Sequence, residues 1–269
     1  MKNEELGVME KTQDLLEVAC EAARLSGSAL ESRLGQALEV RKKSSAVDLV
    51  TEMDLKSEQL IVDFIGKRFP AHAILAEENV YQQTASRYKW IIDPLDGTTN
   101  YAHGYPMYCI SIAIEVDGVV TAGTVYHPPL KEMFTAVRGE GARLNGVELH
   151  VSETGELGEA LTVTGFPYDV RMPPHTNLEY FGRFLKAARA VRRDGSAALN
   201  LAYVAAGRFD GFWELKLRPW DIASGALLVR EAGGRVTGFA GTEVDIYAEE
   251  VLASNGRIHE QMVRLLATP

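Results

Sequence analysis

Apolar residues near the start of the chain repeat with the spacing of an amphipathic helix. The first such segment predicts a helix over residues 12–34, with apolar positions at Leu15, Val18, Ala19, Ala22 and Leu25. A second helix is predicted over 54–68, because Pro70 lies just beyond its end. The apolar face of this second helix consists of Leu60, Ile61, Phe64 and Ile65.

Short runs rich in β-branched residues then predict strands as far as about residue 155. Ala73–Ala76 is a short apolar run that ends at Glu77, and residues 89–93 form another that ends at Asp93. Residues 108–128 contain two such runs joined by Asp117-Gly118, a dipeptide that fits a type I′ hairpin turn. We expect residues 131–139 and 147–152 to add strands to the same sheet.

The pattern changes after about residue 155, where predicted strands and helices alternate. The strands are expected at 160–166, 189–192, 209–215, 235–239 and 251–255, and the helices at 176–189, 196–207, 220–234 and 257–267. Such a pattern predicts an α/β (α+β) fold. We expect one domain over 1–269, with a strand-rich half (about 1–155) and an alternating half (about 156–269).

Composition and charge narrow the classes of function. The chain has 269 residues, 46% of them hydrophobic, and no apolar run approaches the roughly 20 residues that would span a bilayer. The polar N-terminus lacks the layout of a secretory signal, so we expect a cytoplasmic protein without a membrane partner. A formal net charge of −9 argues against direct nucleic-acid binding. Cys20 and Cys109 predict buried free thiols.

Four carboxylates stand at the ends of predicted strands and helices. Glu77 and Asp93 each end a strand, Asp96 follows a turn begun by Pro94, and Asp221 lies in the first turn of a helix. Ligands gather at the carboxyl ends of strands in α/β folds, so these acids are expected to converge. Their mutual repulsion favours a hard divalent cation such as Mg²⁺. The backbone carbonyl of Leu95 is a further candidate ligand.

Each of these acids, taken alone, also fits a local role as a turn former or a helix N-terminal acid. The stretch DPLDGTT (93–99) favours the metal site, because a turn needs only the proline or the glycine. Gly97 allows close backbone approach, and the next residues can open a helix whose free N–H groups bind an anion. Thr98 or Thr99 acting only as an N-cap is the alternative.

Two long motifs resemble the inositol monophosphatase family, within the magnesium-dependent, lithium-sensitive phosphatase superfamily. They are WIIDPLDGTTNY (90–101) and WDIASGALLVREAGG (220–234), supported by VDLVTEMD (47–54), LAEEN (75–79) and residues 195–214. The resemblance covers about residues 12–265 and is strongest to the bacterial branch. It implies a layered αβαβα sandwich, a homodimer, two or three Mg²⁺ ions and inhibition by lithium.

The resemblance also implies roles for individual residues. Five groups would be metal ligands: Glu77, Asp93, the Leu95 carbonyl, Asp96 and Asp221. Asp54 and Thr98 would orient the attacking water. Glu77 would also take part in catalysis. Gly97 and Thr98 would hold the phosphate, next to Leu95, Asp96 and Asp221. The alcohol half of the substrate would meet Arg192, Ser196, Ala197 and Glu214.

These residues imply Mg²⁺-dependent hydrolysis of a phosphate monoester of a polyol or sugar. Glu214 favours inositol 1-phosphate over a bisphosphate, since an ionised carboxylate accepts hydrogen bonds from hydroxyls and disfavours a second phosphate nearby, unless Arg192 or Arg193 supplies compensating charge. Within the superfamily, fructose-1,6-bisphosphatase, 3′(2′),5′-bisphosphate nucleotidase, histidinol-phosphatase and NADP phosphatase remain alternatives. A scaffold that binds a protein or RNA partner is an alternative of a different class.

Overall fold

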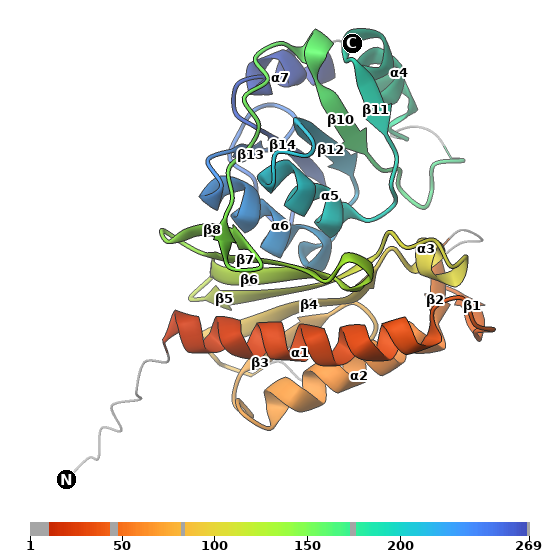
Figure 1. The fold of residues 1–269 in the computed structure, drawn as a ribbon, viewed down its shortest axis with the longest axis vertical. Coiled ribbons are helices and arrows are strands. Elements are labelled where there is room, and N and C mark those ends of the chain that lie inside the picture. The colour runs from red at the N-terminus through yellow and green to blue at the C-terminus, as the bar shows by residue number, and fades with distance from the viewer. Residues whose placement is uncertain (1–10, 44–47, 82–83, 173–175, 268–269) are drawn as a thin grey trace.

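A seven-stranded sheet runs through the lower half of the molecule (Figure 1). The computed structural model describes residues 11–43, 48–81, 84–172 and 176–267. Neighbouring strands of this sheet are antiparallel, except that β3 and β4 are parallel. In spatial order the strands are β3 (Ala73–Ala76), β4 (Tyr88–Asp96), β5 (Cys109–Val116), β6 (Val119–His127), β7 (Glu132–Val137), β8 (Gly141–Leu144) and β9 (Val147–Glu148).

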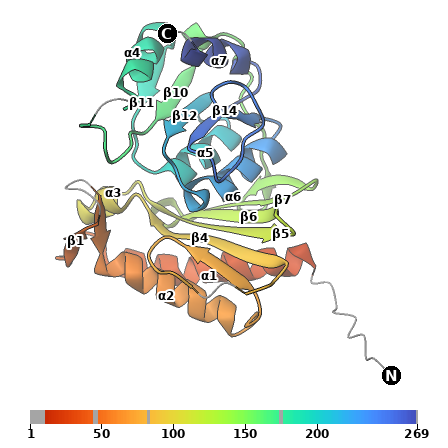
Figure 2. The same ribbon diagram turned by 180° about the vertical axis from the view of Figure 1, so that it is seen from behind.

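Two helices cover each face of this sheet. The apolar stripes of α1 (Thr12–Arg33) and α2 (Glu52–Gly66) pack on one face, and α5 (Ala197–Ala205) and α6 (Pro219–Glu231) pack on the other (Figures 1 and 2). Apart from Asn200 and Tyr203, α5 is apolar, and it is buried along its whole length, as expected for a helix between two sheets.

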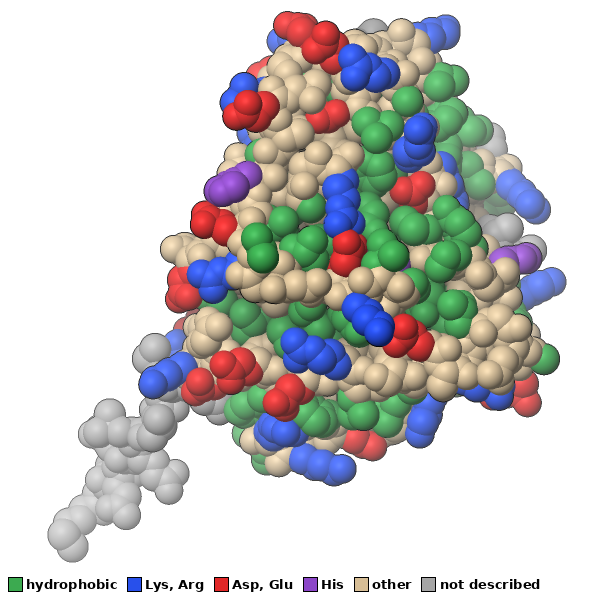
Figure 3. Space-filling view, viewed as in Figure 1, with side chains coloured by type: hydrophobic (Ala, Val, Ile, Leu, Met, Phe, Trp, Pro, Cys, Tyr) green, Lys and Arg blue, Asp and Glu red, His purple; other side chains and the backbone are tan. Residues whose placement is uncertain are grey.

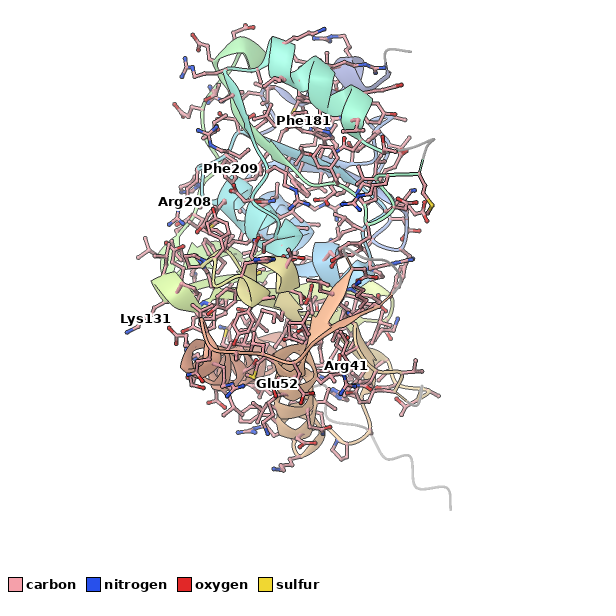
Figure 4. The ribbon with its side chains drawn as sticks, turned by 90° about the vertical axis from the view of Figure 1, so that its right-hand side faces the viewer. Arg41, Glu52, Lys131, Phe181, Arg208 and Phe209 are labelled. Carbon is pink, nitrogen blue, oxygen red and sulfur yellow. The ribbon has the colours of Figure 1, made fainter. Side chains whose placement is uncertain are left out.

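A five-stranded mixed sheet lies on the far side of α5 and α6. Its strands in spatial order are β11 (Ala190–Arg192), β10 (Leu161–Thr164), β12 (Gly211–Leu215), β14 (Glu250–Ser254) and β13 (Arg235–Thr237). The outer face carries α4 (Leu178–Ala187) and α7 (His259–Ala267). Figure 4 shows Phe181 of α4 near one end of the molecule and Glu52 of α2 toward the other. The layers therefore follow the expected αβαβα order.

The remaining elements are short. They are the antiparallel pair β1 (Val40–Lys42) and β2 (Leu49–Thr51), the helix α3 (Thr98–Ala102), and two 3₁₀ turns at Pro128–Leu130 and Leu157–Glu159. No helix in the described ranges is long and apolar enough to span a membrane. On the face shown in Figure 3, Lys and Arg side chains are interspersed with Asp and Glu and do not gather into one basic patch.

Several predicted elements are confirmed. The strand Ala73–Ala76 has the predicted bounds. Asp117 and Gly118 both have positive φ, 50° and 81°, as a type I′ turn requires. The second helix starts earlier than predicted, at Glu52, because Thr51 and Asp54 form a capping box in front of it.

The prediction that a strand ends at Asp93 and turns at Pro94 is wrong. β4 continues to Asp96, with a register shift between Asp93 and Asp96. Asp93 pairs with Ser111 and Asp96 with Cys109, so three steps along β4 match two along β5. This extra residue is a β-bulge. The strands β1, β2 and β8 were not predicted, since they are short and partly exposed and carry little apolar pattern.

Candidate active site

The bulge in β4 explains how Asp93 and Asp96 can serve one site. Side chains alternate along a strand, so residues three apart normally point to opposite faces. One additional residue in the bulge returns both carboxylates to the same face. The turn within the bulge is held by Asp93 itself, because the Leu95 N–H donates to Asp93 Oδ1 over 3.0 Å.

Glu77 reaches Asp93 through the parallel pairing of β3 with β4. Ala76 pairs with Ile92, so the next residues along the two strands are Glu77 and Asp93. The side chain of Asp93 also interacts with Asp221, which comes from the first turn of α6. Asp221 is fixed there because its Oδ2 accepts the Arg218 N–H at 2.7 Å. Segments that are far apart in the chain therefore deliver four acids to one place.

Asp96 is oriented by the start of α5. Its Oδ2 accepts hydrogen bonds from Ser196 Oγ and from the Ala198 N–H, both at 2.7 Å, and Cys109 Sγ lies 3.6 Å away. Free N–H groups and the positive end of the dipole make a helix N-terminus a favourable place for a carboxylate. With Oδ2 engaged in this way, Oδ1 is the oxygen of Asp96 that remains for a ligand.

The electrostatics of this acid cluster are unfavourable without a cation. Burial, followed by repulsion from Glu77 and Asp96, raises the pKa of Asp93 well above its ordinary value, and similar causes raise the pKa of Asp221. Asp93 and Asp96 are buried, whereas Glu77 and Asp221 are half-buried. Repulsion among acids in this setting favours either protonation or a bound cation.

One lysine already neutralises part of this charge. Lys43 Nζ lies 2.8 Å from Glu77 Oε1 and 2.5 Å from Glu78 Oε1. Burial alone would lower the pKa of Lys43, but the two carboxylates outweigh it and hold the pKa above its ordinary value. Sequence reasoning missed Lys43, because it follows the unpredicted strand β1 and reaches acids more than 30 positions away.

The donor set fits a hard cation. Every candidate ligand is an oxygen, which is the preference of Mg²⁺ and not of zinc. Within the described ranges, no three His, Cys, Asp or Glu side chains form a ready-made metal cage. Mg²⁺ does not need one, since it keeps several waters and binds through few carboxylates. The acids therefore fit a partly hydrated cation better than a fully dehydrated one.

Asp54 and Thr98 form a buried pair beside these acids. Thr98 Oγ1 donates to Asp54 Oδ1 at 2.7 Å, and Asp54 Oδ2 accepts from both the N–H and the hydroxyl of Thr51. Burial raises the pKa of Asp54 to about 6, against the opposing effect of these hydrogen bonds. The carbonyl oxygen of Leu95 lies 3.1 Å from the same hydroxyl, but the shorter contact to the Asp54 carboxylate takes its single proton. The oxygen of Thr98 can therefore accept a hydrogen bond from a water.

Gly97 makes the turn between Asp96 and Thr98. Its φ of 98° belongs to the left-handed region that favours glycine. A Cβ at this position would also lie 2.8 Å from the carbonyl oxygen of Met107. No other residue fits here without shifting the backbone, so the glycine sets the path of the chain from the acids into α3.

A cavity of about 620 Å³ opens over the acid cluster. Its wall includes eight of the expected site residues, namely Glu77, Asp96, Gly97, Thr98, Ser196, Ala197, Glu214 and Asp221. Asp54 and Asp93 do not line it but contact residues that do. Loop residues 165–169 and Met172, which the sequence did not single out, form the outer wall.

Glu214 also lines the cavity, near the end of β12 and next to loop residue Gly165. Burial, then Asp221 and Asp96, raise its pKa to about 8, while Arg193 acts in the opposite direction. Gly165 leaves the space that this carboxylate occupies, since a Cβ there would lie 2.0 Å from Glu214 Oε1. Glu214 is therefore held close to the backbone of the neighbouring loop.

Two expected contacts to the alcohol differ in the structure. The hydroxyl of Ser196 is engaged with Asp96, so it is not directed at the alcohol half of a substrate. Arg193 lines the cavity, whereas Arg192 does not and donates to the neighbouring carbonyl of Val191 at 3.4 Å. Adjacent residues at a strand end point in different directions, and the sequence alone did not show which arginine faces inward.

Comparison with known proteins places this arrangement in a family. The model of the inositol monophosphatase family matches residues 11–268. The chain belongs to the inositol monophosphatase family. It is 43% identical over 256 residues to an inositol-1-monophosphatase of Synechocystis, covering 95% of this chain and 89% of that protein. It is 41% identical over 252 residues to Nus factor SuhB of Escherichia coli, covering 93% and 94%.

Solved structures agree with this family fold. An inositol monophosphatase from Anabaena (Nostoc) superposes with a TM-score of 0.86 at 42% identity, over 94% of this chain and 95% of that one. An IMPase/NADP phosphatase complexed with Mg²⁺ and phosphate gives a TM-score of 0.84 at 28% identity, over 96% of each chain. The expected fold class and the resemblance to the inositol monophosphatase family are confirmed.

Proposed function

We propose that this protein is a Mg²⁺-dependent phosphate monoester hydrolase that acts on myo-inositol monophosphates. The observation that carries the proposal is the convergence of Glu77, Asp93, Asp96 and Asp221 beside the buried Asp54–Thr98 pair. Acids that would destabilise one another in an empty site become favourable when cations are bound. The related IMPase/NADP phosphatase with Mg²⁺ and phosphate supports the same use of this family fold.

The residues that would hold the cations are Glu77, Asp93, the Leu95 carbonyl, Asp96 and Asp221. Divalent cations in such sites lower the pKa of a water and stabilise the charge of the leaving oxygen. They also turn an acidic cavity into one that attracts a phosphate. The number of ions proposed is two or three.

The chain's own groups then position the reactants. Thr98 would orient the attacking water by accepting a hydrogen bond from it, because its own proton is directed at Asp54. As the water loses a proton to the Thr98 oxygen, the hydroxyl proton of Thr98 would pass to the Asp54 carboxylate. The N–H groups of Gly97 and Thr98 face the phosphate, and Gly97 keeps the backbone close to it. Phosphate transfer to water needs mainly positioning and charge neutralisation, so no protein nucleophile is required.

The alcohol half of the substrate is assigned to the side of Glu214. Its carboxylate, when ionised, accepts hydrogen bonds from hydroxyls, which favours a polyol such as inositol. Arg193, which lines the cavity beside it, replaces Arg192 as the arginine proposed to contact substrate. The backbone of Ala197 completes this side, whereas Ser196 is assigned to the orientation of Asp96.

Phosphate release from a panel of esters at fixed Mg²⁺ tests this function. We expect inositol 1-phosphate to have a higher kcat/KM than fructose 1,6-bisphosphate, 3′,5′-bisphosphate nucleotides, histidinol phosphate or NADP. We also expect inhibition by Li⁺ and a cytoplasmic homodimer, the latter checked by light scattering. A bisphosphate preferred over inositol 1-phosphate would contradict the assignment of Glu214.

The relation to Nus factor SuhB supports a second candidate function, in which this chain binds a protein or RNA partner. The acids of the site are intact, so such a role would accompany hydrolysis and not replace it. Asp93→Asn separates the two functions: it should abolish hydrolysis and leave binding to the protein or RNA partner unchanged.

A further inference from the structure

Ser57 of α2 donates a buried hydrogen bond into the middle of the proposed metal-ligand segment. Its Oγ lies 2.6 Å from the carbonyl oxygen of Pro94. Ser57 is fully buried, and Pro94 stands between Asp93 and Leu95 in the bulge of β4. None of the motifs described above includes Ser57.

A second serine fixes the direction of this hydrogen bond. Ser26 Oγ of α1 lies 2.5 Å from Ser57 Oγ, and Ser26 is also fully buried. A carbonyl oxygen can only accept, so the one proton of Ser57 goes to Pro94. Ser26 must then donate its own proton to Ser57. A chain of two hydrogen bonds thus runs from α1 through α2 into the bulge.

The hydrogen bond from Ser57 to the Pro94 carbonyl replaces a strand-to-strand hydrogen bond that the bulge removes. Pro94 and Leu95 have no paired residue in β5, because the register passes from Asp93–Ser111 to Asp96–Cys109. The Pro94 carbonyl is buried there, and a buried carbonyl needs a hydrogen-bond donor. In the peptide unit between Pro94 and Leu95, the C=O is bound by Ser57 and the N–H is bound by Asp93 Oδ1.

We propose that Ser57 is a positioning residue for the metal centre. It holds the Pro94–Leu95 peptide unit in one rotation, and that rotation sets the directions of the Asp93 carboxylate and the Leu95 carbonyl. The inference rests on the metal-ligand set of the proposed function. Groups that orient metal ligands through hydrogen bonds commonly affect metal affinity about 10- to 100-fold.

Two neighbours of Ser57 on α2 hold adjacent parts of the site. Asp54 accepts the hydroxyl of Thr98 at 2.7 Å. Glu58 is fully buried, and its Oε2 accepts the backbone N–H of Glu78, the residue after Glu77, at 2.8 Å. One helix face thus contacts three separate segments of the site, namely β4, the start of α3 and the residues after β3, so Ser57 acts as part of a rigid support.

The test is binding of Mg²⁺ to EDTA-treated full-length protein, measured by titration calorimetry without substrate. We expect Ser57→Ala to weaken Mg²⁺ binding about 10- to 100-fold. Ser57→Thr keeps the hydroxyl. Ser57→Val places a side chain of nearly the same shape as threonine at this position, without the hydroxyl. The Val variant should bind Mg²⁺ more weakly than the native protein, whereas the Thr variant should keep the native Mg²⁺ affinity within about threefold. The Thr and Val variants also provide the test if the alanine variant fails to fold.

Ser26→Ala is the matched control, since it removes the outer hydrogen bond from an equally buried serine and leaves the bond to Pro94. Its Mg²⁺ affinity should stay within about threefold of the native value. Equal Mg²⁺ affinities for the native protein, Ser57→Ala and Ser57→Val would overturn the inference. So would equal losses in Ser26→Ala and Ser57→Ala, which would indicate general loosening. Absence of Mg²⁺ binding in the native protein would overturn the proposed function, and this inference with it.

Discussion

The two sides of the cavity are held in different ways. Asp93 and Asp96 belong to one buried strand, β4, which pairs with β3 and β5 on its two sides. Hydrogen bonds from α2 and from the start of α5 hold it further, at Pro94 and Asp96. The side that faces the alcohol is bounded by loop 165–172, where Tyr168 is 53% and Met172 67% exposed. If the proposed function holds, rigid elements would set the position of the phosphate, whereas the choice of alcohol would depend on a more open wall.

The largest effect is expected on the rigid side. Asp93→Asn should reduce turnover roughly 10²- to 10³-fold or more, because Asp93 lies between the other acids and its charge would serve both cations. Phosphate release and Mg²⁺ titration measure this effect. Asp14→Asn, an exposed acid in the first turn of α1, is the control and should behave as native. Full activity in Asp93→Asn would rule out the metal assignment.

Thr98→Ala should lower kcat about 10²- to 10⁴-fold, the range typical of groups that position or accept a proton. The Mg²⁺ affinity should fall much less than kcat, since the hydroxyl of Thr98 is not itself a proposed ligand and makes only a longer contact, 3.1 Å, to the Leu95 carbonyl. Thr98→Ser keeps the hydroxyl and should retain much of the activity. A parallel loss of Mg²⁺ binding would mean that Thr98 acts on the metal and not on the water.

On the open side, Glu214→Gln should raise the KM for inositol 1-phosphate by about tenfold or more, as expected for losing a hydrogen bond to a charged acceptor. The KM for p-nitrophenyl phosphate should change little, because this ester has no hydroxyls for Glu214 to bind. Equal losses on both esters would show that Glu214 supports the fold or the metal site. The comparison between the two sides would then fail.

A smaller effect concerns the stability of the metal-free protein. Asp54 and Glu214 have pKa values raised to about 6 and about 8, so the folded state binds more protons than the unfolded state between about pH 4 and pH 8. These two carboxyls, with the other acids of the cluster, lower the stability as the pH rises through this window. They outnumber the buried His259, whose pKa is lowered to about 4 and which acts in the opposite direction. We expect the Tm in EDTA to be several degrees lower at pH 8 than at pH 5, since 1 kcal/mol corresponds to roughly 2–4 °C. Mg²⁺ should remove this difference, and a Tm that rises with pH in EDTA would contradict the account.

The sequence predicted the rigid side better than the open side. The motif DPLDGTT placed the acids correctly along the chain, but residues three apart on a regular strand point to opposite faces. Only the register with Ser111 and Cys109 shows the bulge that brings Asp93 and Asp96 together. The pattern of residues along one strand does not show how that strand pairs with its neighbour. A turn was therefore predicted at Pro94, where the structure has a β-bulge.

Contacts between distant segments were out of reach for the same reason. Lys43 meets Glu77 across 34 positions, and Ser57 meets Pro94 across 37. Neither lysine nor serine carries a local signal for such a role. Arg193 lines the cavity and Arg192 does not, although the two are the same residue type and adjacent in the chain. Which of them faces the cavity depends on the path of the chain from β11 to α5.

Phosphate release from inositol 1-phosphate by EDTA-treated protein, followed during a Mg²⁺ titration, shows directly whether the four acids form a magnesium-dependent site. The four converging acids predict no release without the cation and a saturable return of activity as Mg²⁺ is added. Calorimetry on the same sample should show Mg²⁺ binding over the same concentration range. Turnover in the metal-free protein, or no turnover at any Mg²⁺ concentration despite binding, would contradict the claim that these acids form a magnesium-dependent phosphatase site.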